Sequence, residues 1–278
     1  MYQVYHTPRP TLPQLQIRSN SAVAYSLPLE QTPYNRKANI NAPTYSGKVT
    51  DHAAKRIKRT CEILLMRSPP RTVWNTVTNF PCQFRLTFAT ITISATTIID
   101  HREAYERGLK PLLRWLRDKQ GWKDYLWKAE LQTRGQIHWH VTGNQFLDWR
   151  HLKSQWNNIQ YQRGWLDEYH GKTGLWTPNS TDIHAVGNVK RLDLYLAKYI
   201  SKTGGQINGK VWDCSETLRG KKFFTFEPNY DTQDLIDEKT KRGEIRRIAL
   251  ENCSILEMKN PEKLIPQNEL GNWASWKI

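Results

Sequence analysis

The stretch GQIHWHVTG, residues 135–143, places a histidine on each side of a tryptophan in an otherwise apolar run. Successive side chains of a β-strand point to opposite faces of a sheet. As a strand, this stretch therefore directs His138 and His140 to one face, about 6 to 7 Å apart at Cα. The opposite, buried face receives Ile137, Trp139 and Val141. The spacing of the two imidazoles suits two ligands of one metal ion.

The preceding stretch DYLWKAELQ, residues 124–132, alternates as a second strand, and QTRGQ connects the two as a tight turn. A three-residue loop with Gly135 in the left-handed conformation sets Glu130 opposite His138. A two-residue loop would set Glu130 opposite Trp139, which mixes a carboxylate into the apolar face. The hydrophobic pattern therefore favours the first register.

In that register Glu130, His138 and His140 share one exposed face of the sheet. Neutral imidazoles and a carboxylate bind divalent cations such as Mn²⁺, Mg²⁺ or Zn²⁺, and three protein ligands leave positions open for water or a substrate oxygen. The alternative interpretation is two solvent-facing histidines beside a surface glutamate. Both interpretations stay open at this point, and the first predicts a metal site accessible to substrate.

A second pattern lies in NVKRLDLYLAKYISKTGG, residues 188–205, which has helical spacing and ends in glycines. Tyr195 and Tyr199 lie one helical turn apart, and Lys198 and Lys202 repeat the offset beside them. A tyrosine phenolate attacks a phosphodiester and keeps the 5′ phosphate as a phosphotyrosine, while a neighbouring cation stabilises the developing charge. The alternative is an ordinary amphipathic helix whose tyrosines belong to the core.

The 278-residue chain carries 41 Lys and Arg against 26 Asp and Glu, a net charge of +15. Such a balance favours a polyanionic partner. Nucleic acid fits better than a membrane surface, because no helix stands out with one basic and one strongly apolar face. The sequence has no apolar run of 18 residues and no CxxC pair, so neither a membrane span nor a cysteine zinc site is expected.

Composition predicts three regions. Residues 1–59, rich in Pro, Asn, Ser and Thr, are expected to form a basic, largely irregular arm. Residues 60–226 carry the motifs and predict an α+β domain, and residues 227–278 form a C-terminal extension. The expected strands are 84–94, 124–132, 136–143, 181–186 and a last one at 223–228. The expected helices are 52–68, 100–121, 148–164 and 188–205.

These motifs resemble those of the HUH endonucleases, the rolling-circle replication initiators of small single-stranded DNA phages, plasmids and related viruses. IHWHV is similar to their HUH motif, and YLAKYISK resembles the two-tyrosine form of their last motif, as in small icosahedral phages. FRLTFATITIS loosely resembles their first strand motif, and Glu130 stands where the family often places its acidic ligand. The resemblance covers residues 84–205.

The resemblance implies a five-stranded antiparallel sheet flanked by helices, with the metal site on the sheet and the tyrosine helix beside it. The implied activity is nicking of single-stranded DNA, covalent attachment to the 5′ end, strand transfer and rejoining. The implied ligands of Mg²⁺ or Mn²⁺ are Glu130, His138 and His140. The implied catalytic residues are Tyr195, Tyr199, Lys198 and Lys202.

The expected partner is a single-stranded DNA origin, with the oligomeric state left open. A host or viral helicase is also expected, because Leu166 replaces the first glycine of a phosphate-binding loop ending at GKT, residues 171–173. The location would be intracellular, wherever the element replicates, and the bacterial cytoplasm is favoured over the eukaryotic nucleus.

Three alternatives remain. A relaxase or single-strand transposase would use the same chemistry, but relaxases often place the tyrosine before the histidines, whereas Tyr195 follows them here. A non-catalytic nucleic-acid-binding protein predicts that Tyr195→Phe leaves function intact. A structural zinc protein predicts tightly held, stoichiometric zinc.

Overall fold

The computed structural model describes residues 11–28, 47–75, 78–186 and 205–278. The chain divides into two compact units. The central unit is the described part of Pro43–Lys221, and the terminal unit joins residues 11–28 to Lys222–Ile278. Among the described residues, no helix combines the length and the apolar character needed to cross a membrane.

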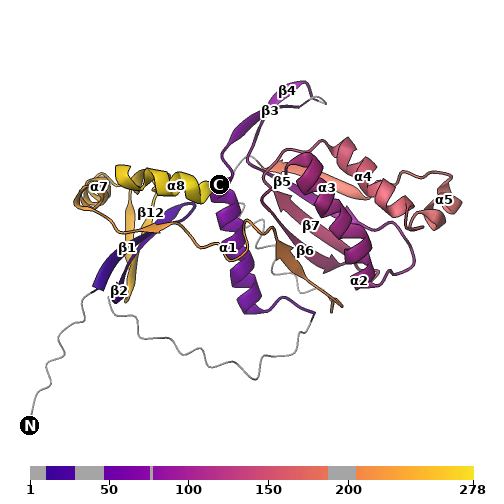
Figure 1. The fold of residues 1–278 in the computed structure, drawn as a ribbon, viewed down its shortest axis with the longest axis horizontal. Helices are drawn as coiled ribbons and strands as arrows, with labels where there is room; N and C mark the ends of the chain where they lie inside the picture. The colour runs from indigo at the N-terminus through magenta and orange to yellow at the C-terminus, as the bar shows by residue number, and fades with distance from the viewer. Residues whose placement is uncertain (1–10, 29–46, 76–77, 187–204) are drawn as a thin grey trace, which may run out of the picture. The chain divides into compact units, whose positions relative to one another are not determined.

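A five-stranded antiparallel sheet forms the centre of the central unit, with the strand order β8-β5-β7-β6-β9. Figure 1 shows the strand that carries the two histidines, β7, in the interior of this sheet. The strands are β5 (Leu86–Thr92), β6 (Tyr125–Leu131), β7 (Ile137–Gly143), β8 (Thr181–Val186) and β9 (Trp212–Cys214). This architecture confirms the α+β fold and the five-stranded antiparallel sheet implied by the resemblance.

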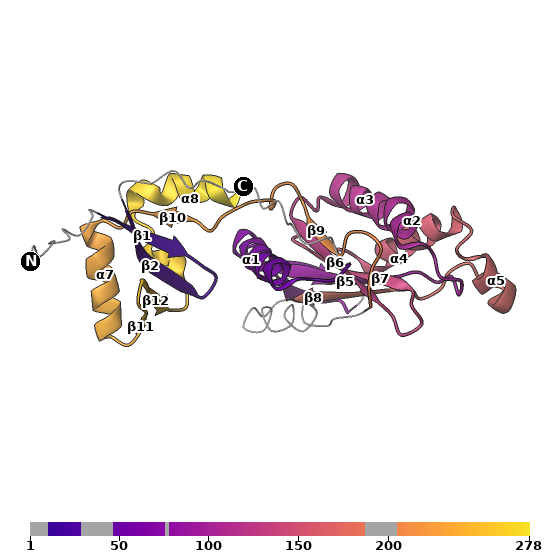
Figure 2. The same cartoon turned by 90° about the horizontal axis from the view of Figure 1, so that it is seen from below.

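Helices pack on the sheet face that lies opposite the two histidines. Trp139 of β7 meets Trp156 of α4 with ring centroids 6.2 Å apart, and both belong to one buried core with leucines of α3. Figures 1 and 2 show α3 lying across this face. The helices of this layer are α2 (His101–Glu103), a π-helical turn (Ala104–Leu109), α3 (Lys110–Gln120), α4 (Trp149–Tyr161) and α5 (Asp167–Thr173).

Helix α1 (Asp51–Arg67) packs against β6 and is tied to the sheet by a buried ion pair. The Arg67 guanidinium lies 2.8 Å from the Asp124 carboxylate at the start of β6, and both side chains are almost fully buried. The paired geometry offsets the cost of removing both charges from water. A separate hairpin of β3 (Arg71–Asn75) and β4 (Phe80–Phe84) leads from α1 to β5.

The terminal unit is built on a second sheet, with the order β10-β1-β2-β12-β11. In Figure 1 the indigo β1 and β2 lie beside the orange β12, which comes from the other end of the chain. The strands are β1 (Thr11–Ile17), β2 (Ser21–Pro28), β10 (Thr225–Phe226), β11 (Arg246–Ala249) and β12 (Cys253–Glu257). The helical segments are α7 (Tyr230–Lys241), α8 (Leu270–Lys277) and two 3₁₀ turns, Pro261–Leu264 and Gln267–Glu269.

Two expectations differ from this structure. Within the irregular arm expected over 1–59, residues 11–28 instead form paired strands, because β12 and β10 supply hydrogen-bonding partners about 200 positions away. The last strand expected at 223–228 is shorter, and β10 pairs with β1 rather than extending the central sheet. The helix expected at 188–205 lies, up to residue 204, outside the described residues.

Candidate metal centre

The hairpin of β6 and β7 brings together the three ligands predicted from the sequence. Glu130 pairs directly with His138, as the three-residue loop required. Gly135 has a φ of 84°, in the left-handed region, and the Gln132 amide donates to the Gln136 carbonyl at 2.9 Å. The register predicted from the hydrophobic alternation is therefore confirmed.

Side-chain atoms of Glu130, His138 and His140 converge at one point of the sheet, within 4.8 Å of one another. The Nε2 atoms of His138 and His140 lie 3.6 and 3.4 Å from Oε2 of Glu130. Glu130 and His140 are buried, whereas His138 is partly exposed. Two imidazole nitrogens and one carboxylate oxygen thus face a common position beside a partly open edge.

The hydrogen bonding around the imidazoles fits a bound cation. Nδ1 of His140 lies 3.2 Å from the Thr90 hydroxyl on β5, which orients the ring so that Nε2 faces Glu130. Such outer partners fix the tautomer and orientation of metal-binding histidines. Nε2 of His138 is buried and has no hydrogen bond within the described part of the chain. An unpaired buried nitrogen is costly, and a divalent cation would satisfy it.

The charge states of the cluster also suit metal binding. Burial alone would raise the pKa of Glu130, but the neighbouring His138 and His140 and the Lys128 ammonium hold this pKa far below its usual range. Burial lowers the pKa of His140, which outweighs the opposite effect of Glu130. At neutral pH Glu130 is therefore a carboxylate and His140 a neutral imidazole, the forms that ligate metals.

Lys128 is a site residue that the sequence reasoning did not single out. Its ammonium lies 2.8 Å from Oε1 of Glu130, and both side chains are buried. The two carboxylate oxygens therefore have different neighbours, since Oε1 meets the lysine and Oε2 meets the histidines. Strand alternation does place Lys128 on the face of Glu130, two positions before it, and this was the available signal.

The predicted catalytic residues Tyr195, Tyr199, Lys198 and Lys202 lie outside the described residues, between 187 and 204. Their assignment stays a prediction.

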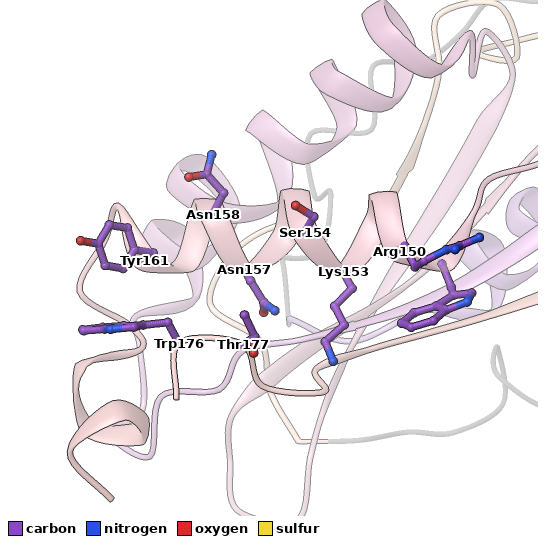
Figure 3. Close-up of a pocket in the computed structure, with 9 residues that line it drawn as sticks. Arg150, Lys153, Ser154, Asn157, Asn158, Tyr161, Trp176 and Thr177 are labelled. Carbon is purple, nitrogen blue, oxygen red and sulfur yellow. The ribbon is translucent and has the colours of Figure 1, made fainter. Parts of the chain in front are cut away.

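A different kind of hollow, of about 520 Å³, lies along α4 and is shown in Figure 3. Lys153 and Asn157 point from the helix toward Thr177, and the rings of Tyr161 and Trp176 meet at one end with centroids 5.0 Å apart. Its described lining includes no carboxylate and no imidazole, and none of it belongs to the sheet. The hollow therefore lacks the donor set of a metal centre.

Comparison with known proteins gives one match. Residues 86–204, less than half of the chain, are similar to the family of the replication-associated protein ORF2. The matched part contains the cluster of Glu130, His138 and His140 as well as both tyrosines of the predicted helix. This similarity supports a role as a rolling-circle replication initiator. No match was found among curated proteins or among solved structures.

Proposed function

We propose that this protein is a replication initiator endonuclease of the two-tyrosine HUH type. It nicks single-stranded DNA at an origin, becomes joined to the new 5′ end through a tyrosine, and rejoins strands during rolling-circle replication. The observation that carries this proposal is the convergence of Glu130, His138 and His140 on one sheet face, within a segment similar to replication-associated proteins.

In this proposal Glu130, His138 and His140 hold one Mg²⁺ or Mn²⁺ ion. The bound cation supplies Lewis-acid polarisation of a phosphate oxygen. Thr90 keeps the His140 ring oriented, and Lys128 keeps the Glu130 carboxylate in place through Oε1. With three protein ligands the site leaves room for a phosphate oxygen of the substrate.

The nucleophile is the phenolic oxygen of Tyr195 or Tyr199. It attacks the phosphorus, its proton passes to solvent, and the bond from phosphorus to the 3′ oxygen breaks. The 3′ hydroxyl is released with a proton taken up, and the 5′ phosphate stays on the tyrosine. Lys198 and Lys202 stabilise the developing negative charge. The ester energy is conserved, so a 3′ hydroxyl rejoins the strand by the reverse attack without ATP.

Two tyrosines allow successive rounds to alternate, because one residue can hold a strand while the other attacks the next. The pattern of YLAKYISK ranks Tyr195 as the first nucleophile. The nuclease domain is assigned to residues 60–226, and strand separation is assigned to a helicase from the host or the element.

The test uses pooled single-stranded oligonucleotides labelled at the 3′ end, incubated with Mn²⁺ and the purified protein. After nicking, the labelled fragment carries the new 5′ end, so the label should migrate with the protein on a denaturing gel. The band should be absent for Tyr195→Phe/Tyr199→Phe and for His138→Ala/His140→Ala, and retained for the exposed His151→Ala control.

An adduct in the double tyrosine variant would refute the nucleophile assignment, and an adduct in the double histidine variant would refute the metal assignment. Tight DNA binding by the wild-type protein without any adduct, with its replicon's own strand included in the pool, would favour a non-catalytic nucleic-acid-binding protein.

A further inference from the structure

A large, strongly basic hollow lies in the central unit, between α1 and the segment 209–221 that contains β9. Its volume is about 800 Å³. Its described lining includes one carboxylate, Asp213, and the following six cations: Lys48, Arg56, Arg59, Lys210, Arg219 and Lys221. We call this site the basic hollow. So large an excess of positive charge on a concave surface concentrates anions from solution.

Pairing within the basic hollow leaves most of this charge uncompensated. Asp213 accepts contacts from Lys210 at 2.8 Å and from Arg219 at 3.4 Å, which uses its carboxylate. Lys48, Arg56 and Arg59 make no ion pair with any residue that the structure describes. An anionic ligand would therefore meet three cations that no carboxylate holds.

Helix α1 presents two different basic faces, and one of them lines the basic hollow. Arg56 and Arg59 line it together with His52, at spacings of three and four residues that share a helical face. Lys55 and Lys58 are also exposed on the same helix but do not line the hollow. The helix thus carries its own matched control of equal charge.

An aromatic contact orders one of these cations. The Arg56 guanidinium lies over the Trp212 ring of β9, 5.3 Å from its centroid. This cation–π contact leaves the guanidinium edge available for hydrogen bonds to a phosphate. Nearby, burial lowers the pKa of Lys221 and the Arg67 charge acts in the same direction, as expected in a region of positive potential.

The basic hollow continues into the side of the candidate metal centre. A narrow hollow lined by Lys128 and Glu130 also has Lys48 and Val211 in its wall. Lys48 and Val211 line the basic hollow as well. A chain of phosphates with one member at the metal centre therefore has a direct continuation past Lys48 toward Arg56 and Arg59.

We propose that the basic hollow binds the sugar–phosphate backbone of single-stranded DNA on one side of the phosphate that is cut. Lys48, Arg56 and Arg59 contact phosphates, and the strand enters the metal centre past Lys48. A single strand fits this concave site because it bends freely, whereas duplex DNA is stiff over about 150 base pairs. The inference rests on the proposed function for its placement relative to the cut.

The test measures binding of a fluorescent oligothymidine by anisotropy, in EDTA and over a series of salt concentrations. Arg56→Gln/Arg59→Gln is compared with Lys55→Gln/Lys58→Gln, which removes the same charge from the same helix. The hollow variant should bind at least about tenfold more weakly, and its slope of log affinity against log salt should fall by about 1.4, since each lost phosphate contact contributes about 0.7. The control should change less than about twofold, as expected for charges that touch no phosphate.

Equal weakening of the two double variants would overturn the proposal. Undiminished preference for duplex over single strand would overturn the choice of ligand. A second pair, Lys48→Gln against Lys58→Gln, repeats the comparison at one exposed residue each, so loss of folding in one arginine variant does not decide the outcome. Again, weaker binding for Lys48→Gln alone supports the proposal, and equal binding contradicts it.

Binding in EDTA needs no nicking, so this result separates the inference from the proposed function. Hollow-dependent binding by a protein that never forms a DNA adduct would sustain the basic hollow and reject the nuclease. A tyrosine adduct from a protein whose arginine and lysine variants bind equally would do the reverse.

Discussion

At the scale of single residues, the candidate metal centre depends on how Glu130 divides its two oxygens. Oε2 faces the imidazoles of His138 and His140, while Oε1 is held by Lys128. The buried ammonium stabilises the carboxylate by charge, and it also repels any cation placed among the three ligands. Lys128 and a metal ion therefore compete for the same negative charge.

Replacing a ligand should abolish metal binding without unfolding the protein. His140→Ala removes one of three donors, and we expect the affinity for Mn²⁺ to fall by more than about tenfold, since even partners outside the ligand set contribute about 10- to 100-fold. His151→Ala, an exposed histidine of α4, is the control and should bind Mn²⁺ like the wild type. Isothermal titration calorimetry checks both, and equal affinities would refute the assignment.

Lys128→Met should have opposite effects with and without metal. In EDTA the variant leaves the Glu130 carboxylate buried without its ion pair, so the melting temperature should fall. With Mn²⁺ present, the competing ammonium is gone, and the rise in melting temperature on adding metal should exceed that of the wild type. Differential scanning calorimetry measures both shifts; a smaller metal-induced rise would contradict the proposed competition.

At the scale of elements, β7 is constrained on both of its faces. One face carries the histidines, and at its end Gly143 packs so closely on the buried Trp122 that a Cβ would overlap the indole. The sequence indicated β7, its hairpin and its register, because alternation and Gly135 are local signals. It did not indicate β9, β1 or β2 as sheet members, because their partners lie far away along the chain.

Gly143→Ala should therefore destabilise the central unit. The added methyl forces the Trp122 indole or the strand to shift, which costs about 1 to 3 kcal/mol for overpacking a core. Gly171→Ala is the matched control, because its Cβ in α5 meets nothing within 4 Å. That control should stabilise slightly, by about 0.4 to 1 kcal/mol, through the unfolded state. Urea unfolding measures both, and equal midpoints would show that the close contact does not matter.

At the scale of the whole molecule, the metal cluster and the basic hollow belong to one unit, Pro43–Lys221. Composition alone drew the nuclease domain from 60 to 226, because the polar and basic residues before it suggested an arm. Helix α1 crosses that boundary, since it starts at Asp51. Its basic front reads as a solvated face in the sequence, and only the position of β9 reveals it as the wall of a hollow.

This division predicts how fragments behave. The fragment 43–221 retains all of α1 and should fold and bind Mn²⁺ like the full chain. The fragment 60–226 lacks the first turns of α1, including Arg56 and Arg59, and should melt at a lower temperature and bind single-stranded DNA more weakly. Circular dichroism and anisotropy compare the two. A fragment 60–226 as stable as 43–221 would support the boundaries drawn from composition.

The most direct test of the proposed function is mass spectrometry of the protein after incubation with origin-bearing single-stranded DNA and Mn²⁺. Nuclease trimming leaves a short nucleotide on the attacked residue, and trypsin cleavage after Lys198 separates Tyr195 and Tyr199 into different peptides. We predict the nucleotide mass on one of these two peptides, dependent on Mn²⁺ and lost in His138→Ala/His140→Ala. A nucleotide on any other residue, or an adduct that forms equally without the histidines, would contradict the account.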